Sequence, residues 1–108
     1  MTAEEFVELF AREREALVGL YSDPSSQTEV ARLFRSSNSA AGTDQETFKA
    51  AIRQIVTDVY YSILLAIDGE ASLGGVQQSY AVFAEDGSKV SGEPGDLEKY
   101  AFRVLQQS

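Results

Sequence analysis

The sequence predicts a single α+β domain in the order α-α-α-β-β-α, and three patterns lead to this prediction. Ser/Thr-x-x-Glu capping boxes precede three apolar-periodic segments, and helical periodicity continues without a break through the middle of the chain. Near the end, an Asp-Gly turn separates two short β-forming stretches. Residues 1–42 are expected to form a helical N-terminal part. Residues 43–108 are expected to form a long central helix packed by a hairpin and a C-terminal helix.

The first helix is predicted to run from about Ala3 to Tyr21. It begins at the capping box Thr2-x-x-Glu5, in which the hydroxyl accepts from the glutamate amide and the carboxylate accepts from the threonine amide. Asp23-Pro24 ends the helix, because proline disfavours helical geometry in the residue before it. Steps of three, four and seven residues give an expected core face of Phe6, Leu9, Phe10, Leu17 and Leu20 or Tyr21.

A shorter second helix is predicted over about residues 27–35, after the capping box Ser26-x-x-Glu29. The apolar side chains that we expect to face inward from it are Val30, Leu33 and Phe34. The polar run over residues 36–42 is predicted to be a loop within the domain.

The third predicted helix, from Thr43 to about Ile67, is the longest element. It opens on the capping box Thr43-x-x-Glu46 and would be about 37 Å long, which is enough to cross the domain. Residues 59–67 are rich in β-forming side chains, so helix and strand both stay open there, and the continuous helical phase favours helix. The apolar residues that keep the helical spacing are Phe48, Ile52, Ile55, Val56, Val59, Tyr60, Ile63 and Ile67.

A hairpin and a last helix are predicted after residue 79. Tyr80–Phe83 alternates as a strand does, Asp86-Gly87 supplies the turn, and Lys89–Ser91 returns. After a break over residues 92–95, Asp96 is expected to cap an amphipathic helix. The core face of that helix is predicted to be Leu97, Tyr100, Ala101, Val104 and Leu105.

Composition excludes several classes of function. The chain has no histidine, cysteine or tryptophan, which excludes disulfides, thiol nucleophiles, ordinary zinc sites and a Ser-His-Asp triad. We therefore expect no enzyme and no cofactor. The net charge of −8 argues against binding to nucleic acid or to anionic membranes. The longest uninterrupted apolar run, Ile63–Ile67, is short for a membrane span and no signal peptide is present, so a cytoplasmic protein is predicted, with its oligomeric state open.

The acidic residues concentrate between Asp68 and Glu98, where only Lys89 opposes them. If the loops of this stretch share one end of the domain, their carboxylates form a surface that fits a basic partner. Otherwise these carboxylates are separate solvated charges that keep the protein soluble. Tyr61 is added to the candidates because it lies off the apolar stripe of its helix. The candidate partner-binding residues are thus Asp68, Glu70, Glu85, Asp86, Glu93 and Tyr61.

Three functions follow from these features. The first is a non-enzymatic interaction protein that binds a basic protein. The second is a domain that binds a small molecule or a divalent metal through Asp68, Glu70 and Asp86, because hard cations prefer carboxylate oxygens. The third is an acidic mimic of nucleic acid, of the type that phages use, which would space its carboxylates like phosphates along one face.

The C-terminal two thirds also resemble a group of small uncharacterised bacterial proteins. The resemblance lies in Leu64-Leu65-Ala66-Ile67-Asp68-Gly69, the Tyr80 strand, the Glu85-Asp86-Gly87 turn and the closing helix over Leu97–Leu105. Those proteins carry an apolar helix that ends in a (L/I)-D-G step, then a hairpin and a final helix. The resemblance covers about residues 43–105. Some small acidic proteins of this kind are immunity partners of toxins, so the resemblance implies a role as an immunity protein.

Overall fold

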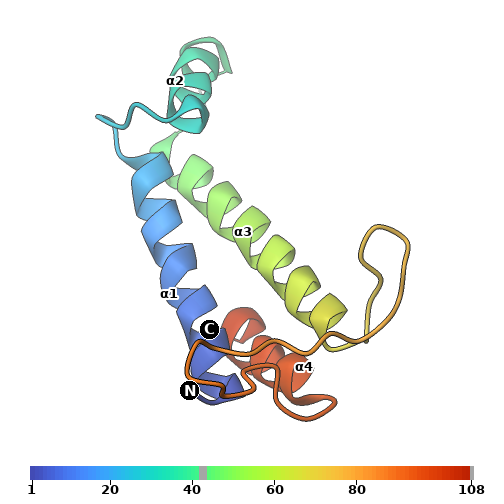
Figure 1. Cartoon of the computed structure of the whole chain (residues 1–108). Coiled ribbons are helices and arrows are strands. Elements are labelled where there is room, and N and C mark those ends of the chain that lie inside the picture. The colour runs from blue at the N-terminus through green and yellow to red at the C-terminus, as the bar shows by residue number, and fades with distance from the viewer. Residues whose placement is uncertain (42–43, 108) are drawn as a thin grey trace. The chain divides into compact units, whose positions relative to one another are not determined.

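The computed structural model describes the backbone of residues 1–41 and 44–107, and the side chains of residues 1–36 and 44–107. These residues are mostly helical (Figure 1). A five-residue π-helical segment, η1, directly continues the last α-helix. The elements are α1 (Ala3–Ser22), α2 (Glu29–Ala41), α3 (Gln45–Ile67), α4 (Asp96–Ala101) and η1 (Phe102–Gln106).

The predicted α+β class is wrong, because residues 80–91 form no strand and the rest of the described chain contains none either. The Asp-Gly turn does form: the Gly87 amide donates to the Ala84 carbonyl at 2.9 Å, with Gly87 at a φ of 90°. Beyond this turn, the β-pairing between the two predicted strands is limited to one isolated bridge, between Phe83 and Lys89. The Val82 amide donates to the side-chain hydroxyl of Ser91 at 3.0 Å instead of to a strand carbonyl. A two-stranded ribbon this short has little stability alone, and no third strand supports it.

Of the three predicted capping boxes, the first is confirmed. The Thr2 amide donates to the Glu5 carboxylate at 2.9 Å, and the Glu5 amide donates to the Thr2 hydroxyl at 3.1 Å. These two hydrogen bonds satisfy amides that have no partner within the helix.

The other two helices begin on different caps from those predicted. In α2 the cap is Thr28, whose hydroxyl accepts from the Ala31 amide at 3.2 Å, while Ser26 hydrogen-bonds to the Thr28 hydroxyl. In α3 it is Asp44, which accepts from the Thr47 amide at 2.7 Å, and the predicted cap Thr43 lies outside the described residues. α2 also continues to Ala41, through most of the predicted loop.

The long helix is confirmed, and residues 59–67 are helical. Its end is a Schellman motif: the Glu70 amide donates to the Leu65 carbonyl at 2.9 Å and the Gly69 amide to the Ala66 carbonyl at 3.1 Å. Gly69 occupies the left-handed position with a φ of 83°, where a side chain would also press on Ser79. The chain therefore leaves α3 sharply after Asp68.

The chain divides into two compact units, and both α1 and α3 contribute to each of them. One unit consists of residues 1–12 and 57–108, and is called the terminal unit below. The other consists of residues 13–56 and is called the middle unit.

The core of the terminal unit is formed where α1, α3, α4 and η1 meet. Phe6 packs edge-on against Phe10 at 5.3 Å between ring centroids, and Phe10 against Tyr60 at 5.1 Å. The predicted core face of the last helix is confirmed, with Tyr100 and Val104 packed at its margin. The part of α1 in this unit buries the smaller Ala3 and Val7. The predicted Phe6 and Phe10 pack against the same core, and the predicted Leu9 is exposed. The buried core residues are Ala3, Val7, Leu64, Leu97, Ala101 and Leu105.

The middle unit has a smaller apolar core. It buries Val18, Ala31 and Ile52, one residue from each of its helices. The rings of Phe34 and Phe48 stack at 3.7 Å between centroids. The prediction that Val30 and Leu33 face inward is wrong, because both are exposed. Of the two alternatives at the end of α1, Leu20 is exposed and Tyr21 is half-buried.

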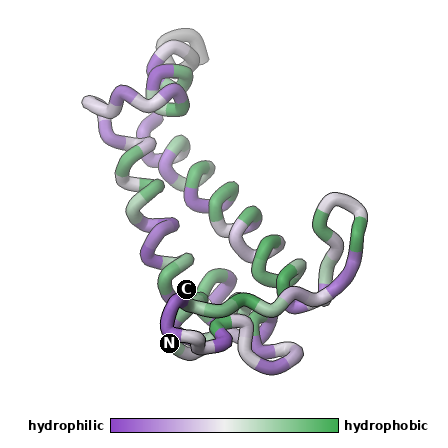
Figure 2. Tube along the Cα trace, viewed as in Figure 1, coloured by the Kyte–Doolittle hydropathy of each residue, from purple (hydrophilic) through white to green (hydrophobic). Residues whose placement is uncertain are grey.

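Apolar residues recur along α3 on more than one side (Figure 2). Ile55, Val59 and Ile63 are exposed although they keep the predicted helical spacing. By length and composition alone α3 could cross a membrane: its most apolar 18-residue window has a mean hydropathy of 1.3, and 22% of that window is buried. Core helices of soluble proteins have similar lengths and compositions, so this property alone does not show that α3 lies in a membrane.

Candidate functional site

Asp68, the first of the predicted acidic residues, caps α4 from a distance. Its carboxylate accepts hydrogen bonds from the Gly95 amide at 3.0 Å and from the Glu98 amide at 3.1 Å. Gly95 is the N-cap residue of α4 and has no side chain of its own to satisfy these amides. A carboxylate at a helix N-terminus is also favoured by the helix dipole. Asp68 therefore joins the end of α3 to the start of α4, 27 and 30 residues further along the chain.

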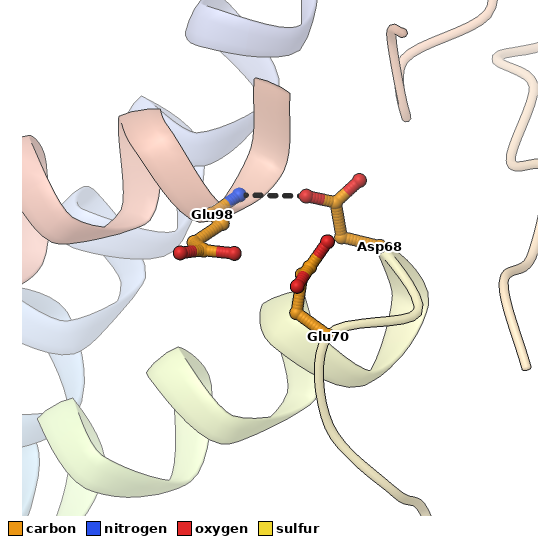
Figure 3. Close-up of side chains that lie close together, drawn as sticks. All are labelled: Asp68, Glu70 and Glu98. Atoms are coloured by element: carbon orange, nitrogen blue, oxygen red, sulfur yellow. Dashed lines mark hydrogen bonds between the residues drawn. The ribbon is translucent and has the colours of Figure 1, made fainter. Parts of the chain in front are cut away.

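This junction brings two further carboxylates to Asp68. Glu70 follows the Schellman turn and Glu98 lies in the first turn of α4, so both are carried to the same point (Figure 3). One carboxylate oxygen from each of Asp68, Glu70 and Glu98 lies within 4.8 Å of the other two. We call these three residues the acidic cluster. In the described part of the chain, no lysine or arginine forms an ion pair with any of them.

The nearby bases already have partners. Lys99 pairs with Asp96 at 3.9 Å, and Arg103 pairs with Glu4 on α1. Two like charges about 4 Å apart repel by about 1 kcal/mol even in water. A cation placed among the three carboxylates would remove this repulsion, so the cluster is suited to bind a Lys or Arg side chain or a hard metal ion.

Glu85 and Asp86 do not belong to this cluster. They are exposed in the turn over residues 84–88, and the Asp86 carboxylate accepts from the hydroxyl and the amide of Ser88 at 2.7 and 2.9 Å. These two hydrogen bonds lower the pKa of Asp86 below its usual value. Asp86 thus stabilises its own turn. Of the carboxylates between Asp68 and Glu98, Asp68, Glu70 and Glu98 come together in the acidic cluster, and Glu85 and Asp86 stay outside it.

The other two predicted residues have different surroundings. Glu93 is exposed and lines a cleft of about 440 Å³ beside the acidic cluster. The cleft lies between the end of α3, the extended segment 79–81 and the loop 91–94. Tyr61, which was expected to be exposed, is half-buried and packs against the core of the terminal unit.

Sequence reasoning missed Glu98 as a member of the site. It was counted among the acidic residues, but nothing in the sequence pairs the third residue of α4 with the end of α3. The available signal was weak: Gly95 provides no side-chain cap for the last helix, so an acceptor had to come from elsewhere.

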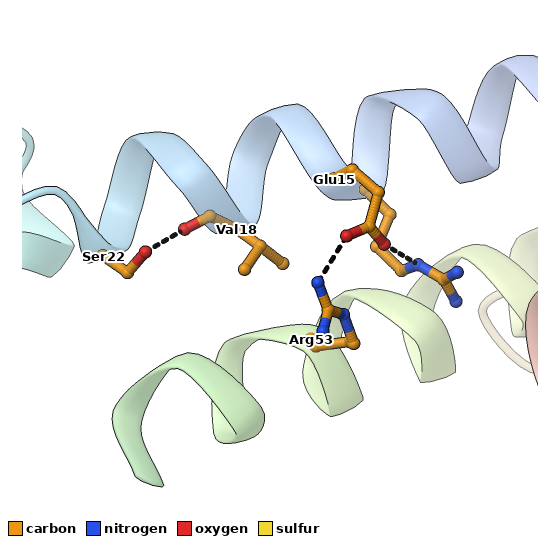
Figure 4. A network of polar contacts seen from close by, with 5 residues as sticks. Glu15, Val18, Ser22 and Arg53 are labelled. Atoms are coloured by element: carbon orange, nitrogen blue, oxygen red, sulfur yellow. Dashed lines mark hydrogen bonds and ion pairs between the residues drawn. The ribbon is translucent and has the colours of Figure 1, made fainter. Parts of the chain in front are cut away.

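A second polar network lies in the middle unit (Figure 4). Glu15 on α1 pairs with Arg53 on α3 and with its neighbour Arg14, whose side chain is buried. Partial burial works against the charge of Glu15, but the hydrogen bonds from Arg53 and then Arg14 outweigh it, and they hold the pKa of Glu15 below its usual value. The Ser22 hydroxyl donates to the Val18 carbonyl at 2.6 Å. The ion pair between Glu15 and Arg53 joins α1 to α3, and the Ser22 bond lies within one turn of α1, so both have a structural role.

No protein-family model, no curated protein and no solved structure matches the chain.

Proposed function

We propose that this chain is a small acidic interaction protein without enzymatic activity, and that it binds a basic protein partner. In this proposal the acidic cluster holds one lysine or arginine side chain of the partner. The observation that carries the proposal is the convergence of three carboxylates within 4.8 Å, to which no base of the described chain is ion-paired.

The charge of the whole molecule supports a basic partner. A net charge of −8 attracts basic proteins over a distance and accelerates their encounter. At contact, a guanidinium or ammonium group donates several hydrogen bonds, and Glu70 and Glu98 have acceptor oxygens that no described side chain uses. A toxin neutralised by an immunity protein would be one partner of this class.

The test compares two variants that change the net charge equally. An oligoarginine peptide is titrated by calorimetry into the wild type, into Glu70→Gln/Glu98→Gln and into the control Glu8→Gln/Glu13→Gln on exposed positions of α1. We expect the cluster variant to lose about tenfold in affinity and the control much less, since each 1.4 kcal/mol is a factor of ten. Equal losses in both variants would mean that only net charge matters, and the cluster would not be the site.

A divalent cation is the second candidate, and the spacing of the cluster favours it specifically. Oxygens bound to one Ca²⁺ at about 2.3–2.6 Å can lie up to about 5 Å apart, which matches the separation of these carboxylates. Millimolar Ca²⁺, Mg²⁺ or Mn²⁺ should then raise the melting temperature of the wild type but not of Glu70→Gln/Glu98→Gln. Stabilisation by none of the three ions would eliminate this candidate and leave the basic-partner proposal intact.

A further inference from the structure

The cleft beside the acidic cluster has walls that the fold holds in place. On one side, the Tyr80 amide donates to the Ile67 carbonyl at 2.8 Å and fixes the extended segment 79–81 to the end of α3. The Val82 amide then donates to the Ser91 hydroxyl at 3.0 Å, which joins this segment to the opposite wall. The space of about 440 Å³ between the walls is within the usual range for small-molecule sites.

Several residues of the cleft lining have small side chains or none. They are Gly69, Ser79, Ala81, Ser91 and Gly92. Gly69 and Gly92 have positive φ values of 83° and 65°, so neither position readily accepts a side chain. At Gly92 a β-carbon would lie 2.7 Å from an Asp96 carboxylate oxygen and 2.9 Å from the Ala3 side chain. Backbone geometry and close neighbours therefore require glycine at these two positions of the cleft wall.

The charged side chains of the cleft lining are Asp68, Lys89 and Glu93. Asp68 keeps its negative charge, but each of its carboxylate oxygens already accepts a hydrogen bond from an amide of the α4 N-terminus. Lys89 and Glu93 remain, and neither forms an ion pair within 4.0 Å in the described part of the chain.

Polar groups without partners also line the cleft. Ser91 is only 5% exposed, and its oxygen accepts from Val82, yet its own proton has no acceptor among the described residues. The main-chain amides and carbonyls of Ser79 and Ala81 likewise make no hydrogen bond within the described chain. A buried hydroxyl and the unpaired main-chain groups of an extended segment offer a ligand both donors and acceptors.

We propose that this cleft binds a small zwitterion of the free amino-acid class. The ligand carboxylate would accept from the Lys89 ammonium and the Ser91 hydroxyl, and its ammonium would donate to the Glu93 carboxylate and to the open carbonyls of segment 79–81. One lysine facing a carboxylate whose oxygens are not yet hydrogen-bonded within the described chain matches a zwitterion better than a nucleotide, which requires several positive groups, or a metal ion, which Lys89 would repel. The cleft shares Asp68 with the acidic cluster, but Glu70 and Glu98, the residues changed to test the partner site, do not line it, so the two proposals are tested separately.

The experiment uses the full chain with glycine, L-serine and L-glutamine as probes, together with the N-acetyl and carboxamide forms of each. Thermal shift and calorimetry should show that the free amino acids bind, and that removing either ligand charge weakens binding by tenfold or more, equivalent to about 1.4 kcal/mol. Lys89→Met should abolish the preference for a free carboxylate, and Glu93→Gln the preference for a free amine. Glu93→Gln keeps the side-chain length, Lys89→Met shortens it by one atom, and the main-chain amide of residue 93 can still donate to Asp96.

Matched controls use a lysine and a glutamate that do not line the cleft, Lys49→Met and Glu85→Gln. These variants should bind the free amino acids as the wild type does, and circular dichroism checks that all four variants fold. The inference is overturned if no free amino acid stabilises the chain at millimolar concentration. It is equally overturned if the blocked forms bind as well as the free ones, or if the controls lose as much affinity as the cleft variants.

Discussion

Two helices of the terminal unit, α1 and α4, begin on carboxylates that reach their amides by different routes. At α1 the cap is local: Thr2 and Glu5 exchange hydrogen bonds across three residues. At α4 the cap is Asp68, which comes from the end of another helix 27 residues earlier in the chain. The local cap stabilises only its own helix, whereas the distant cap also fixes where α4 lies against α3 and thereby assembles the acidic cluster.

The largest effect should come from removing the packing of α4. Leu97 is completely buried among Ala3, Val7 and Leu64. Leu97→Ala should lower the free energy of unfolding by about 3 kcal/mol, because it removes buried apolar surface and leaves a cavity. Urea unfolding measures this, with the half-exposed Phe102→Ala as a control expected to change stability by about 0.5 kcal/mol or less. Equal effects of the two substitutions would mean that α4 does not pack as described.

The distant cap should have the next largest effect. Asp68→Ala leaves the amides of Gly95 and Glu98 without acceptors, at a cost of about 2 kcal/mol in the free energy of unfolding. Asp68→Asn keeps one acceptor oxygen and should cost about half as much. Hydrogen exchange of the Glu98 amide provides the direct measurement, and it should accelerate in both variants.

Glu85→Ala is the control for this comparison, because Glu85 is exposed in a turn and caps no helix. If Asp68→Ala were as mild as Glu85→Ala, the amides of α4 would be satisfied by water and the long-range cap would contribute nothing.

The local cap should have a smaller effect than the distant one. Thr2→Ala removes the acceptor for the Glu5 amide, and an N-cap substitution of this kind typically costs about 1 kcal/mol. Urea unfolding should therefore rank Asp68→Ala above Thr2→Ala. The reverse order would show that the tertiary junction is no stronger than an ordinary helix start.

The same contrast explains what could be predicted from the sequence. Thr2 and Glu5 are three residues apart, so their capping box was visible, as were the length of α3 and the Asp86-Gly87 turn. The bond from Asp68 to α4 depends on how two helices dock, and no local pattern encodes that. The acidic cluster was therefore predicted only in part: Asp68 and Glu70 were found, and Glu98 was not.

Two errors in the predicted fold have a common cause, which is that side-chain type was weighted above tertiary context. On α1 the predicted Phe6 and Phe10 do pack against the core, but the predicted Leu9 is exposed, and the buried Ala3 and Val7 were not predicted. At residues 80–91 the β-forming side chains suggested strands, yet Ser91 satisfies the Val82 amide through its hydroxyl and the pairing ends there. The residue preferences of this segment thus predicted the Asp86-Gly87 turn correctly, but the two strands that they predicted on either side of it do not form.

The smallest expected effect is a pH-dependent change in melting temperature when the Glu5 carboxylate of the α1 cap is replaced. Hydrogen bonds from the Thr2 amide, and secondarily the Thr2 hydroxyl, lower the pKa of Glu5 in the folded chain. A carboxyl group with a lowered folded pKa stabilises the fold above its unfolded pKa of about 4.3, and this contribution is lost as pH falls through the folded pKa. Glu5→Gln should therefore lower the melting temperature slightly at neutral pH, and the difference from wild type should disappear in acid.

Melting temperatures measured between about pH 7 and pH 2 test this, with Glu8→Gln as the control on the same helix. The Glu8 carboxylate makes no hydrogen bond within the described chain, so its replacement should give a curve parallel to that of the wild type. If Glu5→Gln were parallel as well, the ionised carboxylate would not be what caps α1. If instead the difference disappears in acid, the α1 cap depends on a charge open to solvent. Acid would then loosen the start of α1 through a carboxylate whose hydrogen bonds are to Thr2, whereas the α3–α4 junction depends on the hydrogen bonds of Asp68.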